Sequence, residues 1–177
     1  MNQKGFTITE LLVVIFIIGL LSSGVLLSHR GINRKYSLDQ GIQLMLSDLR
    51  KAQHMAMNGV GINNPEIDCG YGLVINSGSP TSYLFYADKH ASNCDLSDNK
   101  YTPGLDASIQ VVTLANDIII DSVSNNPLDI LFKYPEPTAH INQSSAAGVS
   151  GTITLKDKGS IETHSININT AGLIQGN

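Results

Sequence analysis

Residues 1–30 read MNQKGFTITELLVVIFIIGLLSSGVLLSHR, and the interpretation of the whole chain depends on this stretch. A short polar leader ends at Gly5, and soon after Phe6 the sequence becomes almost wholly apolar, from residue 11 to residue 27. One acid, Glu10, stands at the front edge of the apolar run. A charged acid at the centre of a membrane helix costs about 2.5–3.5 kcal/mol, so we expect Glu10 to have a partner and a function.

The apolar run is compatible with three kinds of segment. A secretory signal has a basic start, a shorter apolar stretch and a small-residue cleavage site, for which residues 22–24 (Ser-Ser-Gly) are a candidate. A plain membrane anchor needs about 20 apolar residues, which is close to the length of this run. Neither interpretation explains Glu10 or the Gly5-Phe6 junction that precedes the run.

The third interpretation uses every residue of the motif. The sequence Lys-Gly-Phe-Thr-x-x-Glu-Leu-Leu-Val-Val-Ile at 4–15 resembles the class III leader of type IV pilins and pseudopilins, although Thr9 replaces the isoleucine usual before the acid. The resemblance implies that a prepilin peptidase cuts between Gly5 and Phe6 and methylates the new amine of Phe6. It also implies that Glu10 sets subunit register by pairing with a neighbouring subunit's amine, which would offset the desolvation of the carboxylate.

A continuous helix is expected from Phe6 to the neighbourhood of Asn58-Gly59, because no proline interrupts residues 6–58. In its second half, apolar residues recur at steps of three and four and predict one buried stripe. The stripe consists of Leu38, Ile42, Met45, Leu49, Ala52 and Ala56, and is widened by Leu46.

After residue 65 the pattern changes to short β-branched and aromatic runs separated by Gly, Pro, Asn and Ser. A helix followed by strands predicts an α+β fold, with the helix laid against an antiparallel sheet. The first hairpin turn is expected at 77–80 and another turn at 156–159. Strands are expected at 71–75, 82–87, 109–114, 117–120, 128–134, 151–155 and 165–169.

The second half of the chain also resembles one subgroup, the minor pilins of the H-type pseudopilin family. This resemblance implies one long helix and a two-layer β-rich head. The motifs that carry it are Leu-Arg-x-Ala-x-x-x-Ala at 49–56, Gly-Tyr-Gly-Leu-Val-Ile at 70–75, Leu131-Phe132, and Ile-x-Ile-x-x-Ala-Gly ending at Gly172.

Four segments are therefore expected along the chain. Residues 1–5 form the prepilin leader, and 6–27 form a transmembrane helix that becomes the filament core. Residues 28–58 continue the helix in amphipathic form, and 59–177 form the β-rich globular head.

The two cysteines, Cys69 and Cys94, are expected to form one disulfide, because an even pair in an exported domain is typically oxidised. Two unpaired thiols are the alternative. Closing a loop of this size would stabilise the head by about 3 kcal/mol in the chain-entropy model.

The residue pattern favours a non-enzymatic protein without a cofactor or metal. The five histidines are dispersed and no serine lies in a Gly-x-Ser-x-Gly motif, so an anchored envelope enzyme lacks a recognisable site. Asp95, Asp98 and Asn99 could gather around calcium, but they lack the EF-hand glycine and distal glutamate. An acidic, solvated loop is the preferred interpretation of this segment.

The charge balance argues against nucleic acid as a general partner. The chain of 177 residues has a net charge of −4, and no Lys or Arg follows Lys158. A DNA-uptake or adhesion subunit that binds a ligand through its head is retained as the alternative function.

The expected function is a minor pilin or pseudopilin, a structural subunit of a type IV pilus or type II secretion pseudopilus. Its expected partners are the prepilin peptidase, other pilin subunits and the inner-membrane assembly platform. The chain would span the inner membrane once with Lys4 cytoplasmic and the head outside. A conventional signal peptide would instead start the mature chain near residues 23–28.

Overall fold

The computed structural model describes residues 5, 7–59, 61, 67–90, 93–115, 117–135 and 138–177; the side chains of 24–34 and 67 are not described. The chain divides into two compact units, Met1–Tyr36 and Ser37–Asn177. Helix α1 (Ile8–Asn58) begins in the first unit and ends in the second, which also contains strands β1 to β9. The fold is α+β, with a helix and an antiparallel β-rich region that follows it.

The second half of α1 is amphipathic, as the sequence predicts. All seven residues of the expected stripe are at most 4% exposed. The helix ends at Asn58, and Gly59 adopts a left-handed conformation with φ of 58° that suits a helix C-terminus. The start is corrected from residue 6 to Ile8, because the carbonyl of Thr7 already accepts a hydrogen bond from the amide of Leu11 at 3.2 Å.

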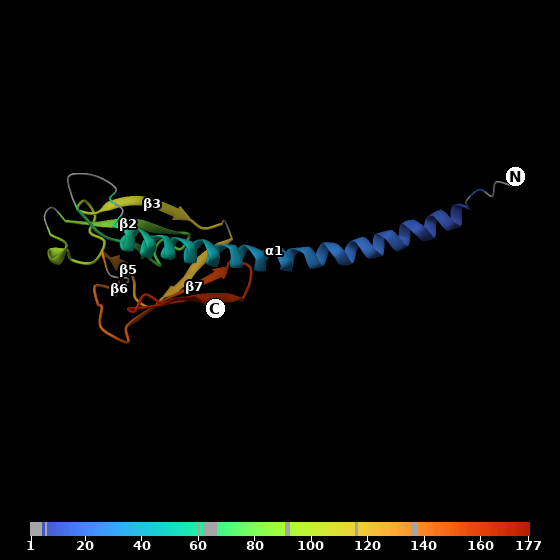
Figure 1. Ribbon diagram of the computed structural model, residues 1–177. Coiled ribbons are helices and arrows are strands. Elements are labelled where there is room, and N and C mark those ends of the chain that lie inside the picture. The colour runs from blue at the N-terminus through green and yellow to red at the C-terminus, as the bar shows by residue number, and fades with distance from the viewer. Residues whose placement is uncertain are drawn as a thin grey trace. The chain divides into compact units, whose positions relative to one another are not determined.

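The strands form two antiparallel sheets (Figure 1). The strand pattern alone predicted one antiparallel sheet, whereas the resemblance to the H-type pseudopilins implied a two-layer head. The first sheet has the order β3 (Ala107–Thr113), β2 (Ser82–His90), β1 (Ile67–Ile75), β5 (Leu128–Lys133), β6 (Ala139–Ile141). The second has the order β4 (Ile118–Val123), β7 (Ser150–Asp157), β8 (Thr163–Asn169), β9 (Ile174–Gly176). A short 3-10 helix, η1 (Cys94–Leu96), follows β2.

All seven predicted strand regions overlap observed strands, and the turn at 77–80 joins β1 to β2. The turn predicted at 156–159 falls slightly later, because β7 continues through Asp157 before the chain reverses into β8. Two strands were not predicted: β6 and β9, each of three residues. Strands that short show too little alternation to be recognised in a sequence.

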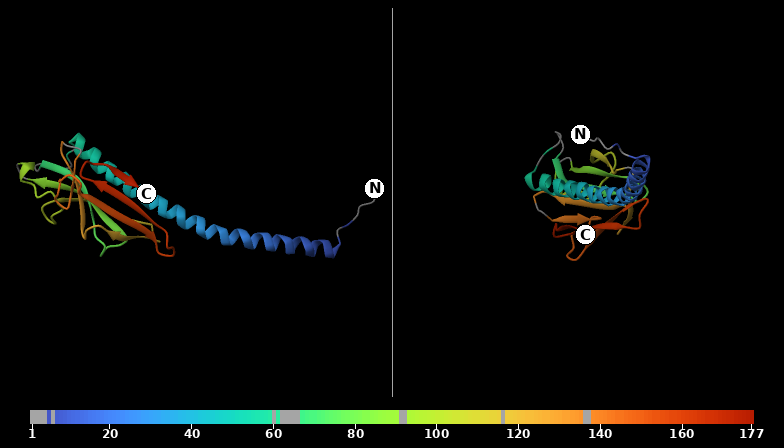
Figure 2. Two further views of the ribbon diagram at one scale, coloured as in Figure 1. Left: turned by 90° about the horizontal axis from the view of Figure 1, so that it is seen from below. Right: turned by 90° about the vertical axis from the view of Figure 1, so that its right-hand side faces the viewer.

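One hydrophobic core joins the helix to both sheets. It contains the stripe of α1, alternate residues of β1, β2 and β5 from the first sheet, and Ile118, Leu155 and Ile166 from the second. In the right-hand view of Figure 2 the second half of α1 lies between the green and yellow strands and the orange and red ones. Gly41 of α1 permits close packing here, since a Cβ at that position would lie 3.3 Å from Ile118.

In the first unit, the large apolar side chains from Ile8 to Leu21 are exposed, between 49% and 85% of their surface. Among the residues that the structure describes, no helix meets the length and apolarity needed to cross a membrane. The transmembrane assignment of residues 6–27 therefore remains a prediction.

Candidate functional site

The predicted cleavage junction lies just before α1. Gly5 is exposed and outside the helix, which begins three residues later at Ile8. Phe6, the predicted site of cutting and methylation, lies outside the described residues. The assignment of Gly5 and Phe6 to processing therefore remains a prediction from the motif.

Glu10 has a partner within its own chain. Its carboxylate oxygen Oε2 accepts hydrogen bonds from the backbone N–H of Thr7 at 2.9 Å and from the Thr7 hydroxyl at 2.8 Å. In return the N–H of Glu10 donates to Thr7 Oγ1 at 3.3 Å. This reciprocal pair is a capping box, in which two backbone donors of the first helical turn are satisfied.

The sequence reasoning did not single out Thr7, although its Thr-x-x-Glu spacing to Glu10 is the capping-box signature. The role predicted for Glu10, pairing with a neighbouring subunit's amine, remains a prediction. The capping box shows how the carboxylate is satisfied in a single chain.

The predicted disulfide between Cys69 and Cys94 is confirmed, with an S–S distance of 2.08 Å and a Cα–Cα distance of 5.0 Å. Cys69 belongs to β1 and is fully buried, whereas Cys94 opens the 3-10 helix η1. The bridge fastens the segment 93–106 to the first sheet. The lack of periodicity at 87–106 predicted a surface loop there. This prediction is corrected in part, because β2 extends to His90.

A tyrosine crosses the middle strand of the first sheet to reach an acid on the far side. The hydroxyl of Tyr86 on β2 donates a hydrogen bond to Asp129 Oδ1 on β5 at 2.5 Å. Its ring passes over Gly72 of β1, where a Cβ would lie only 2.9 Å from a ring carbon. The Gly-Tyr-Gly sequence of β1 therefore makes room for this buried bond.

Loop 93–106 lies on the same face of the first sheet. The backbone N–H of Tyr101 donates to Asp129 Oδ2 at 2.7 Å, and its ring centre lies 5.2 Å from that of Tyr86. The Tyr101 hydroxyl lies 2.8 Å from Ser108 Oγ on β3. These contacts, together with the disulfide, bind the loop to β2, β3 and β5.

Asp98 and Asp106 of the loop lie close to Asp88 of β2, with oxygen atoms of all three carboxylates within 4.8 Å of one another. Asp88 is 1% exposed and accepts a hydrogen bond from the Ser97 hydroxyl. Burial, reinforced by the negative charges of Asp106 and Asp98, raises the pKa of Asp88 to about 7.

The pKa values of two neighbouring acids, Asp129 and Asp106, are also raised. Burial raises the pKa of Asp129 to about 6, although the N–H of Tyr101 and the Tyr86 hydroxyl oppose that shift. Burial also raises the pKa of Asp106, which accepts hydrogen bonds from the N–H groups of Lys89 and Thr102.

The grouping considered from the sequence, Asp95 with Asp98 and Asn99, differs from the one observed. Within the described residues, the cluster draws Asp88 and Asp106 from β2 and the edge of β3 and does not include Asp95. Asp95 is exposed in η1, where its N–H donates to Asn93. Asp88 and Asp106 are far apart in the sequence and become neighbours only through the pairing of β2 with β3, so this cluster could not be recognised from local spacing.

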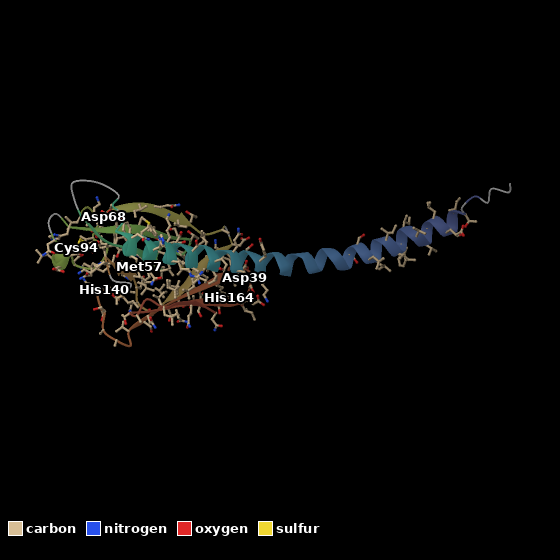
Figure 3. All side chains as sticks on the ribbon, viewed as in Figure 1. Asp39, Met57, Asp68, Cys94, His140 and His164 are labelled. Carbon is tan, nitrogen blue, oxygen red and sulfur yellow. A yellow bond between two sulfur atoms is a disulfide. The ribbon has the colours of Figure 1, made fainter. Side chains whose placement is uncertain are left out.

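Two further contacts, each between an aspartate and a basic side chain, lie at opposite ends of the second unit (Figure 3). Asp68 lies near Cys94; its carboxylate is 3.9 Å from Lys89 Nζ and accepts a hydrogen bond from the Tyr71 hydroxyl at 2.7 Å. At the other end, His164 Nδ1 of β8 lies 3.5 Å from Asp39 Oδ1 of α1. The first contact links β2 to β1, and the second links β8 to α1.

A family model described as the prokaryotic N-terminal methylation motif matches residues 1–26. Comparison with curated proteins and comparison with solved structures each gave no match. The matched region contains Gly5, Phe6 and Glu10, the residues that carry the predicted leader. The motif indicates a type IV pilin-like precursor.

Proposed function

We propose that the chain is a minor pilin or pseudopilin, a structural subunit of a type IV pilus or a type II secretion pseudopilus. The methylation motif at residues 1–26 is the single observation that carries this proposal. The H-type pseudopilins are the subgroup to which we assign it, on the motifs of the helix end and the strands. The role is structural rather than enzymatic.

In this proposal the chain is inserted into the inner membrane through residues 6–27, with the head outside. The prepilin peptidase cuts between Gly5 and Phe6 and methylates Phe6. The apolar side chains of the first unit, such as Leu11 and Phe16, support this proposal because more than half of their surface is exposed among the residues that the structure describes. They would be covered first by lipid and later by neighbouring subunits.

Glu10 then changes partner during assembly. In the single chain Thr7 holds its carboxylate through two hydrogen bonds. In the filament a neighbouring subunit's terminal amine would replace Thr7 as the partner, and an ion pair in a low-dielectric bundle is strong when well matched. Other pilin subunits and the inner-membrane assembly platform are the proposed partners.

The assembly step is tested by substituting Glu10→Ala and measuring the chain in sheared filament fractions and in membranes. We expect Glu10→Ala to remain in the membrane and to be strongly depleted from filaments, because its subunit lacks the charge that pairs with the incoming amine. Asp121→Ala serves as the control, since Asp121 is an exposed acid of β4 in the head. Equal filament incorporation of both variants would contradict the proposed role of Glu10.

A further inference from the structure

A cavity of about 450 Å³ opens on the face of the first sheet beside loop 93–106. Its walls come from the end of β1, the loop, the start of β5 and the turn after β6. Tyr101, Pro103, Pro127 and Val74 provide carbon-rich surfaces, while Gln143 provides an amide. Volumes of 300–1,000 Å³ with an apolar lining and a few polar groups are typical of small-ligand sites.

The walls of this cavity are fastened to one another before any ligand is present. Asp129 accepts a hydrogen bond from the N–H of Tyr101, and its own N–H donates to Asn142 Oδ1 at 2.7 Å. Gln143 Nε2 donates to the carbonyl of Asp98 at 3.2 Å, which joins the turn to the loop. A site whose walls are already fixed loses little conformational entropy when it binds.

The wall formed by the turn after β6 has a strained backbone. Asn142 and Gln143 are consecutive non-glycine residues with positive φ angles of 47° and 71°. Such a conformation is uncommon outside glycine and carries a free-energy cost, and it clusters at ligand-binding positions. Here it turns the chain so that both residues line the cavity.

A second hollow of about 340 Å³ shares Val74, Asn76 and Tyr101 with the first. The half-buried tyrosine therefore lines both hollows. Ser79, Ser82 and Ser108 contribute hydroxyl groups to the second hollow. We call this surface, from Gln143 past Tyr101 to Ser82, the Tyr101 groove.

The chemistry of the groove favours an uncharged ligand with apolar faces and polar edges. Its polar rim is made chiefly of amides and hydroxyls. The charged groups on its lining are already engaged: Lys100 Nζ lies 4.0 Å from Asp98, and Asp129 accepts two hydrogen bonds. A β-linked sugar chain has this amphiphilic character, with C–H groups on its faces and hydroxyls along its edges. A tyrosine ring is well suited to such a ligand because it offers a large apolar surface with a polar tip.

We propose that the Tyr101 groove binds a short stretch of a neutral β-linked glycan, with a sugar ring against Tyr101 and hydroxyls bonded by Gln143 and the serines. Three observations carry the proposal: the hydrogen bonds between the lining segments, the strained turn at residues 142–143, and the polar rim of amides and hydroxyls. It is independent of filament assembly, because every group involved lies within the second unit.

The test is calorimetric titration of the full chain in detergent micelles with cellotriose, a neutral β-linked trisaccharide. We expect saturable binding, and Tyr101→Ala should weaken it by about tenfold, equivalent to about 1.4 kcal/mol of lost contact. Tyr101→Phe keeps the ring and should bind within about threefold of the wild type. Tyr134→Ala should have no effect, because this exposed tyrosine lines neither hollow.

A second variant covers the outcome in which Tyr101→Ala fails to fold, as judged by circular dichroism. Gln143→Ala removes an exposed amide from the opposite wall and should also weaken cellotriose binding. Absence of saturable binding by the wild type would overturn the proposal. Equal affinity of the wild type and the folded Tyr101 and Gln143 variants would overturn it too, as would binding of a proline-rich peptide in place of cellotriose.

Discussion

Single residues in the first sheet show how closely its structure depends on side-chain size. Tyr86 can reach Asp129 only because Gly72 has no side chain at the crossing point. The sequence predicted a strand at 71–75 from its aromatic and β-branched residues. It could not show that a glycine inside the strand is required by a tyrosine on the neighbouring strand, because that contact depends on register.

The substitution Gly72→Ala should destabilise the head by about 1–3 kcal/mol, because overpacking a dense interior forces side chains or backbone to shift. The added methyl would collide with the carbonyl oxygen of Ile130 and lie within 3.0 Å of the Tyr86 ring. Urea unfolding measures the change. Gly61→Ala is the control, since its Cβ would meet none of the described residues within 4 Å. An equal loss in both variants would show that the crossing at Gly72 is not the cause.

The buried acids give the head a definite pH dependence. A carboxyl whose folded-state pKa lies above its unfolded value stabilises the fold at low pH, and that stabilisation is lost as the pH rises through the folded pKa. With the pKa of Asp88 about 7 and that of Asp129 about 6, the head should be less stable at pH 8 than at pH 5. The negative charges of Asp98 and Asp106 act on Asp88 in the same direction, and Lys133 opposes them.

Thermal unfolding of Asp88→Asn at these two pH values measures the contribution of this one acid. The amide can still accept the bond from Ser97 but does not titrate, so the difference in Tm between pH 5 and pH 8 should become smaller than in the wild type. Asp121→Asn should leave the difference unchanged. An unaltered pH dependence in Asp88→Asn would assign the effect to other groups.

At the scale of elements, local patterns were sufficient for the helix and for most strands. The stripe from Leu38 to Ala56 identified the packed face of α1, and Gly59 marked its end. The strand pattern alone did not show which strands belong to which sheet, because the order of pairing depends on contacts between distant segments. The acidic cluster was missed for the same reason: Asp88 and Asp106 become neighbours only when β2 and β3 pair.

Loop 93–106 should depend on the Cys69–Cys94 bridge. The two half-cystines are 25 residues apart, so replacing both with alanine should lower the free energy of unfolding by about 3 kcal/mol. Urea unfolding gives that value, and hydrogen exchange of the Tyr101 amide reports on the loop itself. Leu105→Ala provides an exposed control in the same loop. Unchanged stability together with an unchanged exchange rate in the double variant would show that the other contacts hold the loop alone.

In the whole molecule, an N-terminal methylation motif precedes a helix that ends in a β-rich unit. The motif was recognisable from the sequence because its residues are consecutive, and the family comparison agrees over residues 1–26. The Tyr101 groove was not recognisable, since its walls come from segments as far apart as Val74 and Gln143. Local signals therefore pointed to the processing step, and only the fold revealed the candidate ligand site.

Mass spectrometry of the mature N-terminus, in cells with and without the prepilin peptidase, distinguishes the pilin from a secreted protein. If the chain is a pilin, its mature form starts at Phe6 with an N-methyl group, and the peptidase-null strain retains residues 1–5. A mature chain that starts near residues 23–28 in both strains would contradict the pilin assignment, because it would show removal of the apolar segment by an ordinary signal peptidase.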